Sequence, residues 1–204
     1  MRMKSVHLFP VFASALALSV AACSRQTETP KATASVATPA PKDAVVALPV
    51  IGPAPAWSLK DVNGQTVSSE QFKGKVVVLD FWATWCGPCR QEIPGYADLQ
   101  RKYGKDGLVI IGVSLDSDEH ASDTVKTFVQ KFGVDYQVVM GDDAVQTAFG
   151  GMDAIPTTFL IDRAGQLRDH KVGAEPTKEY EKKVTALLAE PTKEPERKVA
   201  ALLN

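Results

Sequence analysis

Val76-Val77-Val78-Leu79-Asp80-Phe81-Trp82, followed by Ala83-Thr84-Trp85-Cys86-Gly87-Pro88-Cys89, is the most informative segment of this chain. Its uninterrupted apolar run from Val76 to Leu79 is typical of a strand that is buried on both faces of a sheet. We expect this strand over residues 75–81 and a helix over 86–103. Two cysteines separated by two residues, on the first turn of a helix that follows a buried strand, indicate a reversible disulfide.

The two thiols have different expected roles. A helix N-terminus presents unpaired N–H groups and a partial positive charge, which stabilise a thiolate. We therefore expect Cys86 to attack a disulfide and Cys89 to resolve the mixed disulfide by closing a Cys86–Cys89 bridge. The alternative is half of a zinc site, but zinc takes about four ligands. The chain has no second cysteine pair, and His120 and His170 lie far apart in it, so no metal site is expected.

The rest of the pattern predicts an α/β sandwich. Asn63-Gly64 predicts a turn in a β-hairpin that opens the domain over 57–61 and 65–68. Asp142 and Asp143 are expected caps of a short helix that ends near Phe149. Further strands are expected over 108–114, 136–140, 157–161 and 166–172, and further helices over 121–132 and from Thr177. Strands that alternate with helices and end in a hairpin and a helix indicate a mixed central sheet.

The composition fits one globular domain with short additional segments. The chain has 204 residues, 45% of them hydrophobic and 23% charged, and its formal net charge of -1 gives no indication of a nucleic-acid partner. We expect a signal peptide over 1–22, a disordered tether rich in Thr, Ala, Ser and Pro over 23–47, and the folded domain over 48–189. A helical extension is expected over 190–204, which repeats residues 175–189 at 11 of 15 positions.

The leader has the pattern of an export signal. Arg2 and Lys4 precede an apolar segment, residues 8–22, which is shorter than the roughly 20 residues that span a bilayer. Val20-Ala21-Ala22-Cys23 resembles the lipobox of bacterial lipoproteins, and this resemblance implies that Cys23 carries a lipid that anchors the chain to a membrane. An ordinary signal peptide with an incidental cysteine is the alternative. Export predicts a compartment such as the bacterial periplasm, where disulfides persist.

Residues 45–189 resemble the thioredoxin superfamily, and within it the extracytoplasmic TlpA/ResA-like thiol-disulfide oxidoreductases. The segment from Phe81 to Cys89 carries the resemblance, together with Pro94, which falls where that family's first helix has a kinking proline. Ile155-Pro156-Thr157 is similar to the family's cis-proline loop, and Lys171-Val172-Gly173-Ala174 to the strand and glycine beside the active site. The resemblance implies a thioredoxin-like three-layer sandwich in which Pro156 lies against the nucleophilic cysteine and Ile155 and Gly173 contact the substrate.

Two carboxylates are candidate catalytic residues. Asp80 lies in an apolar strand, where an unpaired charge is costly, so a raised pKa and a role as proton acceptor for Cys89 are expected. Its position matches the buried aspartate of thioredoxin, whereas Glu92 matches the glutamate of the ResA-like Cys-x-x-Cys-x-x-Glu-x-Pro pattern. The alternatives are a solvated aspartate at the strand end and an ordinary solvent-facing glutamate on the helix.

The tryptophans are assigned by their surroundings. Trp82 is expected to pack in the core near Asp80, and Trp57 in the core of the hairpin. Trp85, next to the nucleophile, is expected to form an exposed apolar surface on which partners dock. His120 and His170 are expected to be solvated.

The predicted function is that of a membrane-tethered disulfide reductase outside the cytoplasm, with no cofactor. The resemblance implies disulfide-bearing protein substrates, such as apocytochrome c or copper-site cysteines, and a membrane-embedded thiol electron donor. One alternative is a peroxiredoxin-like thiol peroxidase, but that class needs a threonine three residues before its cysteine, and Thr84 is two before Cys86. A non-enzymatic copper-delivery protein is the other alternative.

Overall fold

The computed structural model describes residues 47–191. The predicted signal peptide, the lipidation of Cys23, nearly all of the tether and most of the C-terminal repeat lie outside the described residues. Within residues 47–191, none of the helices combines the length and the hydrophobicity that crossing a bilayer requires.

Eight strands form one mixed sheet, with β4 at its centre. Their order across the sheet is β1-β8-β7-β4-β5-β6-β2-β3. β4 runs parallel to β5 and antiparallel to β7, and β5 runs parallel to β6. The strands are β1 (Gly52–Pro53), β2 (Ser58–Asp61), β3 (Thr66–Ser68), β4 (Val76–Trp82), β5 (Leu108–Ser114), β6 (Gln137–Met140), β7 (Thr157–Ile161) and β8 (Gln166–Val172). The predicted mixed central sheet is therefore confirmed.

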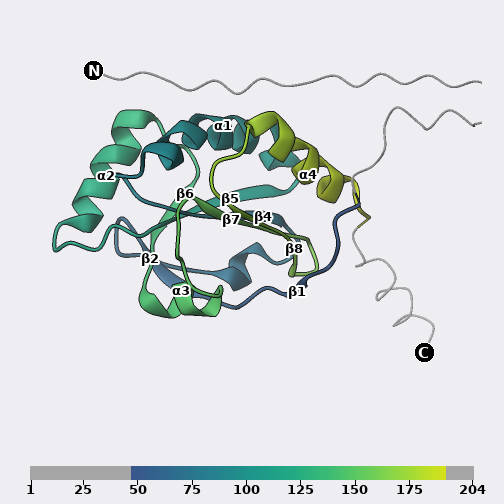
Figure 1. Cartoon of the computed structure of the whole chain (residues 1–204), viewed down its shortest axis with the longest axis horizontal. Coiled ribbons are helices and arrows are strands. Elements are labelled where there is room, and N and C mark those ends of the chain that lie inside the picture. Colours follow the sequence, from purple (N-terminus) through teal and green to yellow (C-terminus); the bar gives the residue numbers. More distant parts are fainter. Residues whose placement is uncertain (1–46, 192–204) are drawn as a thin grey trace, which may run out of the picture. The chain divides into compact units, whose positions relative to one another are not determined.

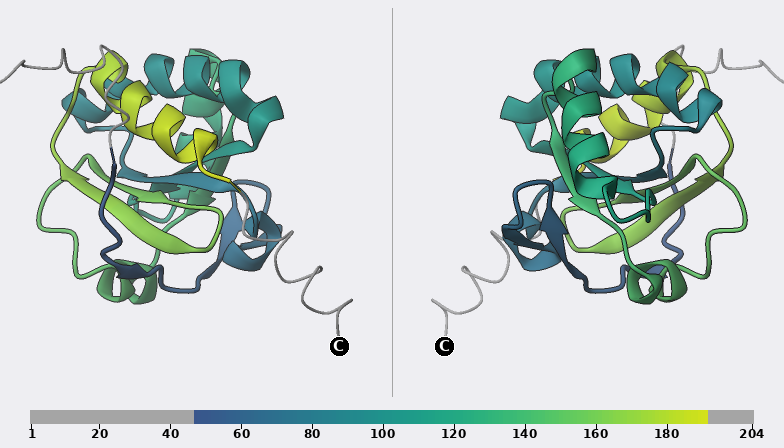
Figure 2. Two further views of the ribbon diagram at one scale, coloured as in Figure 1. Left: turned by 90° about the vertical axis from the view of Figure 1, so that its right-hand side faces the viewer. Right: turned by 90° about the vertical axis from the view of Figure 1, so that its left-hand side faces the viewer.

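Helices cover both faces of this sheet and complete the three layers. The helices are α1 (Gly87–Tyr103), α2 (Ala121–Phe132), α3 (Asp143–Ala148) and α4 (Thr177–Ala189), with short 3-10 turns over Ser69–Phe72 and Gly104–Asp106. Figures 1 and 2 show α1, α2 and α4 on one face and α3 on the other. The predicted three-layer sandwich and its opening hairpin, β2 with β3, are confirmed.

The period-2 geometry of β4 explains where its side chains go. Val76, Val78 and Trp82 belong to a core cluster that packs under α1, α2 and α4. Val77, Leu79 and Phe81 belong to a second cluster on the face of α3 and the hairpin, which includes Trp57. Because successive side chains alternate between faces, Asp80 lies on the α1 face, with Val78 and Trp82 before and after it. The strand is buried on both faces, as predicted.

Most predicted boundaries agree with the structure to within one residue. α2, β5, β7 and β8 have the predicted bounds, and Asp142 caps α3 by accepting a 2.8 Å hydrogen bond from the backbone N–H of Val145. Cys86 is the N-cap of α1 rather than its first helical residue. β1 was not predicted. It pairs with Leu167 and Gln166 at the edge of β8.

A buried arginine joins the two ends of the described chain. The guanidinium of Arg168 donates to the backbone oxygen of Leu48 at 2.7 Å and binds the carboxylates of Asp162 and Glu190 at 2.8 and 2.7 Å. Glu190 is the first residue of the predicted extension, so the contacts of the domain reach one residue beyond 189.

Candidate active site

The strand-to-helix junction after β4 carries a disulfide. Cys86 and Cys89 are joined by a 2.05 Å S–S bond, with their Cα atoms 5.3 Å apart. The Cys86 sulfur accepts a 3.2 Å hydrogen bond from the backbone N–H of Cys89. As N-cap, this sulfur takes up one of the N–H groups that a helix start leaves unpaired. The same contact would stabilise a thiolate on Cys86 in the reduced protein.

Both cysteines are buried, and Cys86 lies against a second loop. Cys89 is 1% exposed and Cys86 5% exposed. The Cys86 sulfur lies 3.7 Å from the backbone oxygen of Ile155, and the Ile155–Pro156 peptide bond is cis, as the resemblance implies. The backbone N–H of Gly173 donates to the oxygen of Pro156 at 2.8 Å. The cis-proline loop therefore connects Cys86 to Gly173.

Asp80 is buried and not solvated at a strand end, so the alternative interpretation of this residue is wrong. It is 2% exposed and accepts a 2.8 Å hydrogen bond from the hydroxyl of Thr158, its direct partner across β4 and β7. Burial raises the pKa of Asp80 to about 7, helped by the charge of Glu92 and opposed by the Thr158 hydrogen bond and the charge of Lys171. A carboxyl group with such a pKa can both accept and release a proton near neutral pH.

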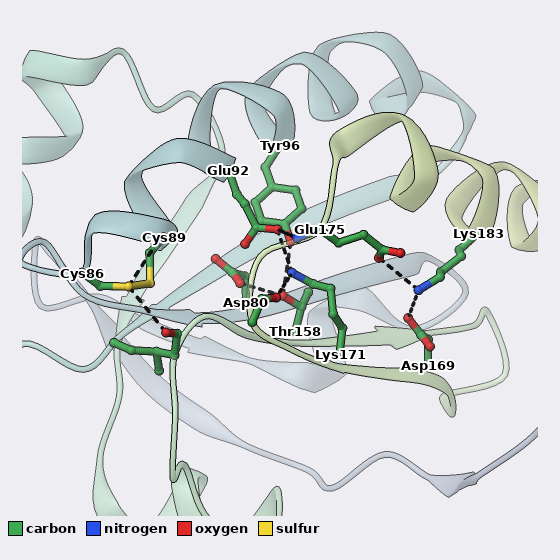
Figure 3. Close-up of polar contacts among 12 residues, drawn as sticks. Asp80, Cys86, Cys89, Glu92, Tyr96, Thr158, Asp169, Lys171, Glu175 and Lys183 are labelled. Atoms are coloured by element: carbon green, nitrogen blue, oxygen red, sulfur yellow. Dashed lines mark hydrogen bonds and ion pairs between the residues drawn. A yellow bond between two sulfur atoms is a disulfide. The ribbon is translucent and has the colours of Figure 1, made fainter. Parts of the chain in front are cut away.

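Glu92 is also buried, and the solvent-facing alternative is wrong for it too. One of its carboxylate oxygens accepts a 2.7 Å hydrogen bond from the ammonium group of Lys171 and a 2.9 Å hydrogen bond from the backbone N–H of Glu175. The other oxygen has no hydrogen-bond partner among the described residues. Lys171 also donates to the backbone oxygen of Gly173 at 2.9 Å. Glu92 and Lys171 therefore connect α1 to the loop that carries Gly173 (Figure 3).

The structure places the other predicted residues as follows. Trp85 is 70% exposed, as expected for a docking surface, while Trp82 is fully buried and Trp57 is 8% exposed in the hairpin core. His120 and His170 are both exposed. The Thr84 hydroxyl donates its single proton to Asp116 at 2.5 Å, so it is not available to donate to Cys86 as a peroxidase threonine would.

A family model described as the AhpC/TSA family matches residues 50–170. The chain belongs to the AhpC/TSA family. Among its relatives in this family are thiol-disulfide oxidoreductases. The protein ResA of Bacillus thuringiensis (strain Al Hakam), described as a thiol-disulfide oxidoreductase, is 39% identical over 138 residues, which cover 65% of this chain and 76% of ResA. The thioredoxin-like protein YneN of Bacillus subtilis (strain 168) is 36% identical over 131 residues, which cover 64% of this chain and 76% of YneN.

A solved structure of the thioredoxin family shares the fold of this chain. A thiol:disulfide interchange protein of the thioredoxin family from Chlorobium tepidum TLS superposes with a TM-score of 0.62 at 32% identity, covering 68% of this chain and 97% of that one. The chain is thus a ResA-like thiol-disulfide oxidoreductase with a thioredoxin fold, and the predicted family, fold and reaction class are confirmed.

Sequence reasoning missed three polar residues of the site. Thr158 and Tyr96 form hydrogen bonds on the Asp80 side, and Lys171 pairs with Glu92. Lys171 was part of the segment recognised by resemblance, without a role of its own. The sequence of β8 gave no clear signal for it, because the two buried residues of the strand, Arg168 and Lys171, are three positions apart and do not follow a regular alternation.

Proposed function

We propose that this protein is a disulfide reductase that works outside the cytoplasm, tethered to a membrane by a lipid on Cys23. One observation is the main support for a reducing role. The Cys86–Cys89 pair starts α1 directly after a strand that buries Asp80, whose pKa is about 7. The Gly87-Pro88 dipeptide and Asp80 are the features shared with thioredoxin, a reductant with a potential of about -270 mV.

The reaction begins with the reduced protein. The thiolate of Cys86 attacks one sulfur of a substrate disulfide, a mixed disulfide forms, and the other substrate sulfur leaves as a thiolate. Cys89 gives its proton to Asp80, and the resulting thiolate attacks the Cys86 sulfur. The second substrate sulfur then leaves, so the substrate gains two electrons and the Cys86–Cys89 disulfide forms. This oxidised state is the one in the structure.

The docking surface is apolar and open, which suits a protein substrate. Trp85 and Val172 are 70% and 60% exposed, and Val172 is paired in the sheet with Thr157, the residue after the cis-proline. We assign substrate contact to Trp85, Ile155 and Gly173, and positioning of the substrate against Cys86 to Pro156. Large apolar side chains left exposed in this way are typical of interaction sites.

The place in the cell and the partners follow from the leader and the family resemblance. A lipid on Cys23 and the predicted tether that follows it would let the domain reach substrates near the membrane surface. Disulfide-bearing proteins are the substrate class, with apocytochrome c or copper-site cysteines as examples. A membrane-embedded thiol protein would return electrons to the Cys86–Cys89 disulfide.

A trapping experiment tests this function. Cys89→Ser leaves the mixed disulfide unresolved, so this variant should accumulate covalent complexes with client proteins, whereas Cys86→Ser should capture none. The purified, reduced wild-type protein should open the disulfides of insulin faster than a small-molecule thiol at equal concentration. A measured reduction potential above about -150 mV, close to that of strong oxidants, would refute the reducing direction.

A further inference from the structure

Two buried hydroxyl groups form a chain that ends on Asp80. The hydroxyl oxygens of Tyr96 and Thr158 lie 3.2 Å apart, and the Thr158 hydroxyl donates to Oδ1 of Asp80 at 2.8 Å. Tyr96 is 3% exposed and Thr158 is fully buried. In Figure 3 Tyr96 extends from α1 toward Asp80 and Thr158. The chain therefore crosses from α1 through β7 to β4.

The single protons of the two hydroxyls fix the direction of this chain. Thr158 gives its proton to Asp80, so the proton between Thr158 and Tyr96 must come from Tyr96. Burial raises the pKa of Tyr96 well above its usual value, so Tyr96 keeps this proton wherever Asp80 titrates. Both hydroxyls therefore point their protons toward Oδ1.

The reversed chain is unfavourable. A proton on Oδ1 of Asp80 would turn the Thr158 hydroxyl toward Tyr96, and the Tyr96 hydroxyl would then need another acceptor. Among the described residues, Thr158 is the only hydrogen-bond partner of that hydroxyl. A buried donor without an acceptor costs free energy. The arrangement therefore keeps Oδ1 as an acceptor and leaves Oδ2 as the oxygen that takes up a proton.

We propose that Tyr96 and Thr158 are positioning residues that hold Oδ1 of Asp80 as a permanent acceptor, so that the proton from Cys89 is taken up on Oδ2. In Figure 3 the Asp80 oxygen that Thr158 does not bind lies on the side toward the disulfide. This inference rests on the proposed role of Asp80 as the proton acceptor for Cys89. It adds that two hydroxyls, neither of which is hydrogen-bonded to the reacting sulfurs in the described residues, set the proton affinity of that acceptor.

The other charged and titratable groups around Asp80 act on the same proton. Glu92 from α1 favours the protonated form of Asp80, and Lys171 from β8 favours the ionised form. Tyr136, before β6, and Tyr180 from α4 complete the set. The charge of Asp80 is among the causes that raise the pKa of each tyrosine. None of these four forms a hydrogen bond to Asp80, so among the described residues Thr158 alone forms a hydrogen bond to one of its two carboxylate oxygens.

The test compares three single variants, and one double variant that combines two of them, in the oxidised protein, in which the cysteines do not titrate. Thr158→Val removes the hydroxyl and keeps the shape, Thr158→Ser keeps the hydroxyl, and Tyr96→Phe removes the far end of the chain. The pKa of Asp80 is followed by the pH dependence of its carboxyl ¹³C NMR signal, which is identified by its loss in Asp80→Asn.

Loss of the hydroxyl at position 158 removes a hydrogen bond that is stronger to the ionised carboxylate than to the neutral acid. Thr158→Val should therefore raise the pKa of Asp80 by about one unit or more. Thr158→Ser should leave the pKa within roughly 0.3 units of the wild-type value. Tyr96→Phe should raise it by a smaller amount, about 0.3 to 0.5 units, because it weakens the Thr158 hydrogen bond without removing it. In the Thr158→Val background, Tyr96→Phe should have no further effect, because its influence passes through Thr158.

Two results would overturn the proposal. The first is an equal effect of Tyr96→Phe in the wild-type protein and in the Thr158→Val variant, and the second is an effect of Thr158→Ser as large as that of Thr158→Val. A separate measurement tests the role of Asp80 itself. The reduced variants are mixed with 5,5′-dithiobis(2-nitrobenzoate), and the second release of nitrothiobenzoate reports the attack by Cys89. If the pKa shifts appear but the pH profile of this step does not follow them, the hydroxyl chain stands and the proposed role of Asp80 fails.

Discussion

Replacing Asp80 by asparagine should make the stability of the oxidised protein much less dependent on pH. The pKa of Asp80 rises from 3.8 to about 7 on folding, mainly because the carboxylate is buried. Each pKa unit corresponds to about 1.36 kcal/mol, so the ionised side chain costs the native state about 4 kcal/mol. Asparagine has nearly the same shape and keeps an oxygen that can accept from Thr158, but it carries no charge at any pH.

The direction of this effect follows from the proton balance. Between pH 4 and 7 the native state holds the Asp80 proton more tightly than the unfolded chain, so raising the pH favours unfolding. The stabilisation is complete below about pH 4, is lost progressively up to the folded pKa of about 7, and is absent above it. We therefore expect the stability of Asp80→Asn relative to wild type to increase by about 4 kcal/mol between pH 4 and pH 8.

Urea unfolding at a series of pH values measures this difference. Comparing the two proteins at each pH cancels the titration of all the other groups, which they share. Asp153→Asn, which alters an exposed aspartate, is the matched control and should track wild type within about 0.5 kcal/mol throughout. A constant difference between Asp80→Asn and wild type from pH 4 to pH 8 would refute the conclusion that burial sets the pKa of Asp80.

Three further substitutions test the structure around the site. Lys171→Met leaves Glu92 buried without its cation and should lower the free energy of unfolding by about 3 to 5 kcal/mol. The double variant Glu92→Gln/Lys171→Met should lose less, because it leaves no buried charge without a partner. Urea unfolding measures both. Gly112→Ala would place a Cβ atom 2.8 Å from the indole nitrogen of Trp82 and should lower the thermal unfolding midpoint, with an overpacking cost of about 1 to 3 kcal/mol. Trp85→Ala should leave stability within about 0.5 kcal/mol of wild type, since the ring is exposed, but should raise KM for insulin reduction without changing the reduction potential.

The elements with a strong local pattern were predictable from the sequence. The apolar run of β4 and the periodic face of α2 each encode their own structure within a few residues, and the observed bounds differ little from those expected. β1 has no such pattern. It contains only Gly52 and Pro53, and it is a strand because the N–H of Ile51 and the backbone of its neighbours meet the free edge of β8. A pairing of this kind depends on tertiary structure and leaves no periodic pattern in the sequence.

In the candidate site, too, some residues were predictable from the local sequence and others depend on tertiary structure. Cys86, Cys89 and Asp80 lie within ten residues of one another, so their relation could be deduced from one strand and one helix. Thr158 is 78 residues from Asp80 in the sequence, and only the antiparallel register of β4 and β7 makes them direct partners. From the sequence alone, Tyr96 is expected only to be an aromatic core residue of α1. Its hydroxyl has the proposed positioning role because it forms a hydrogen bond with Thr158.

β8 shows why simple polarity rules fail near this site. It buries Arg168 and Lys171 and exposes Val172, the reverse of the usual strand pattern. Each buried cation meets carboxylates supplied by other elements, Asp162 and Glu190 in one case and Glu92 in the other. Val172 is exposed at the end of the strand that lies beside the cis-proline loop, where a substrate surface is proposed. Both departures therefore have a reason in the tertiary structure.

The distribution of donors explains how one chain accommodates both the thioredoxin aspartate and the ResA-like glutamate. Two buried carboxylates near one another repel when both are ionised, and the buried ammonium group of Lys171 lies near the two. It forms its hydrogen bond with Glu92, which also accepts from the backbone N–H of Glu175. Among the described residues, Asp80 accepts a hydrogen bond only from the neutral hydroxyl of Thr158. Asp80 lies on the face of β4 that α1 covers, and because burial raises its pKa to about 7, it can exchange a proton near neutral pH.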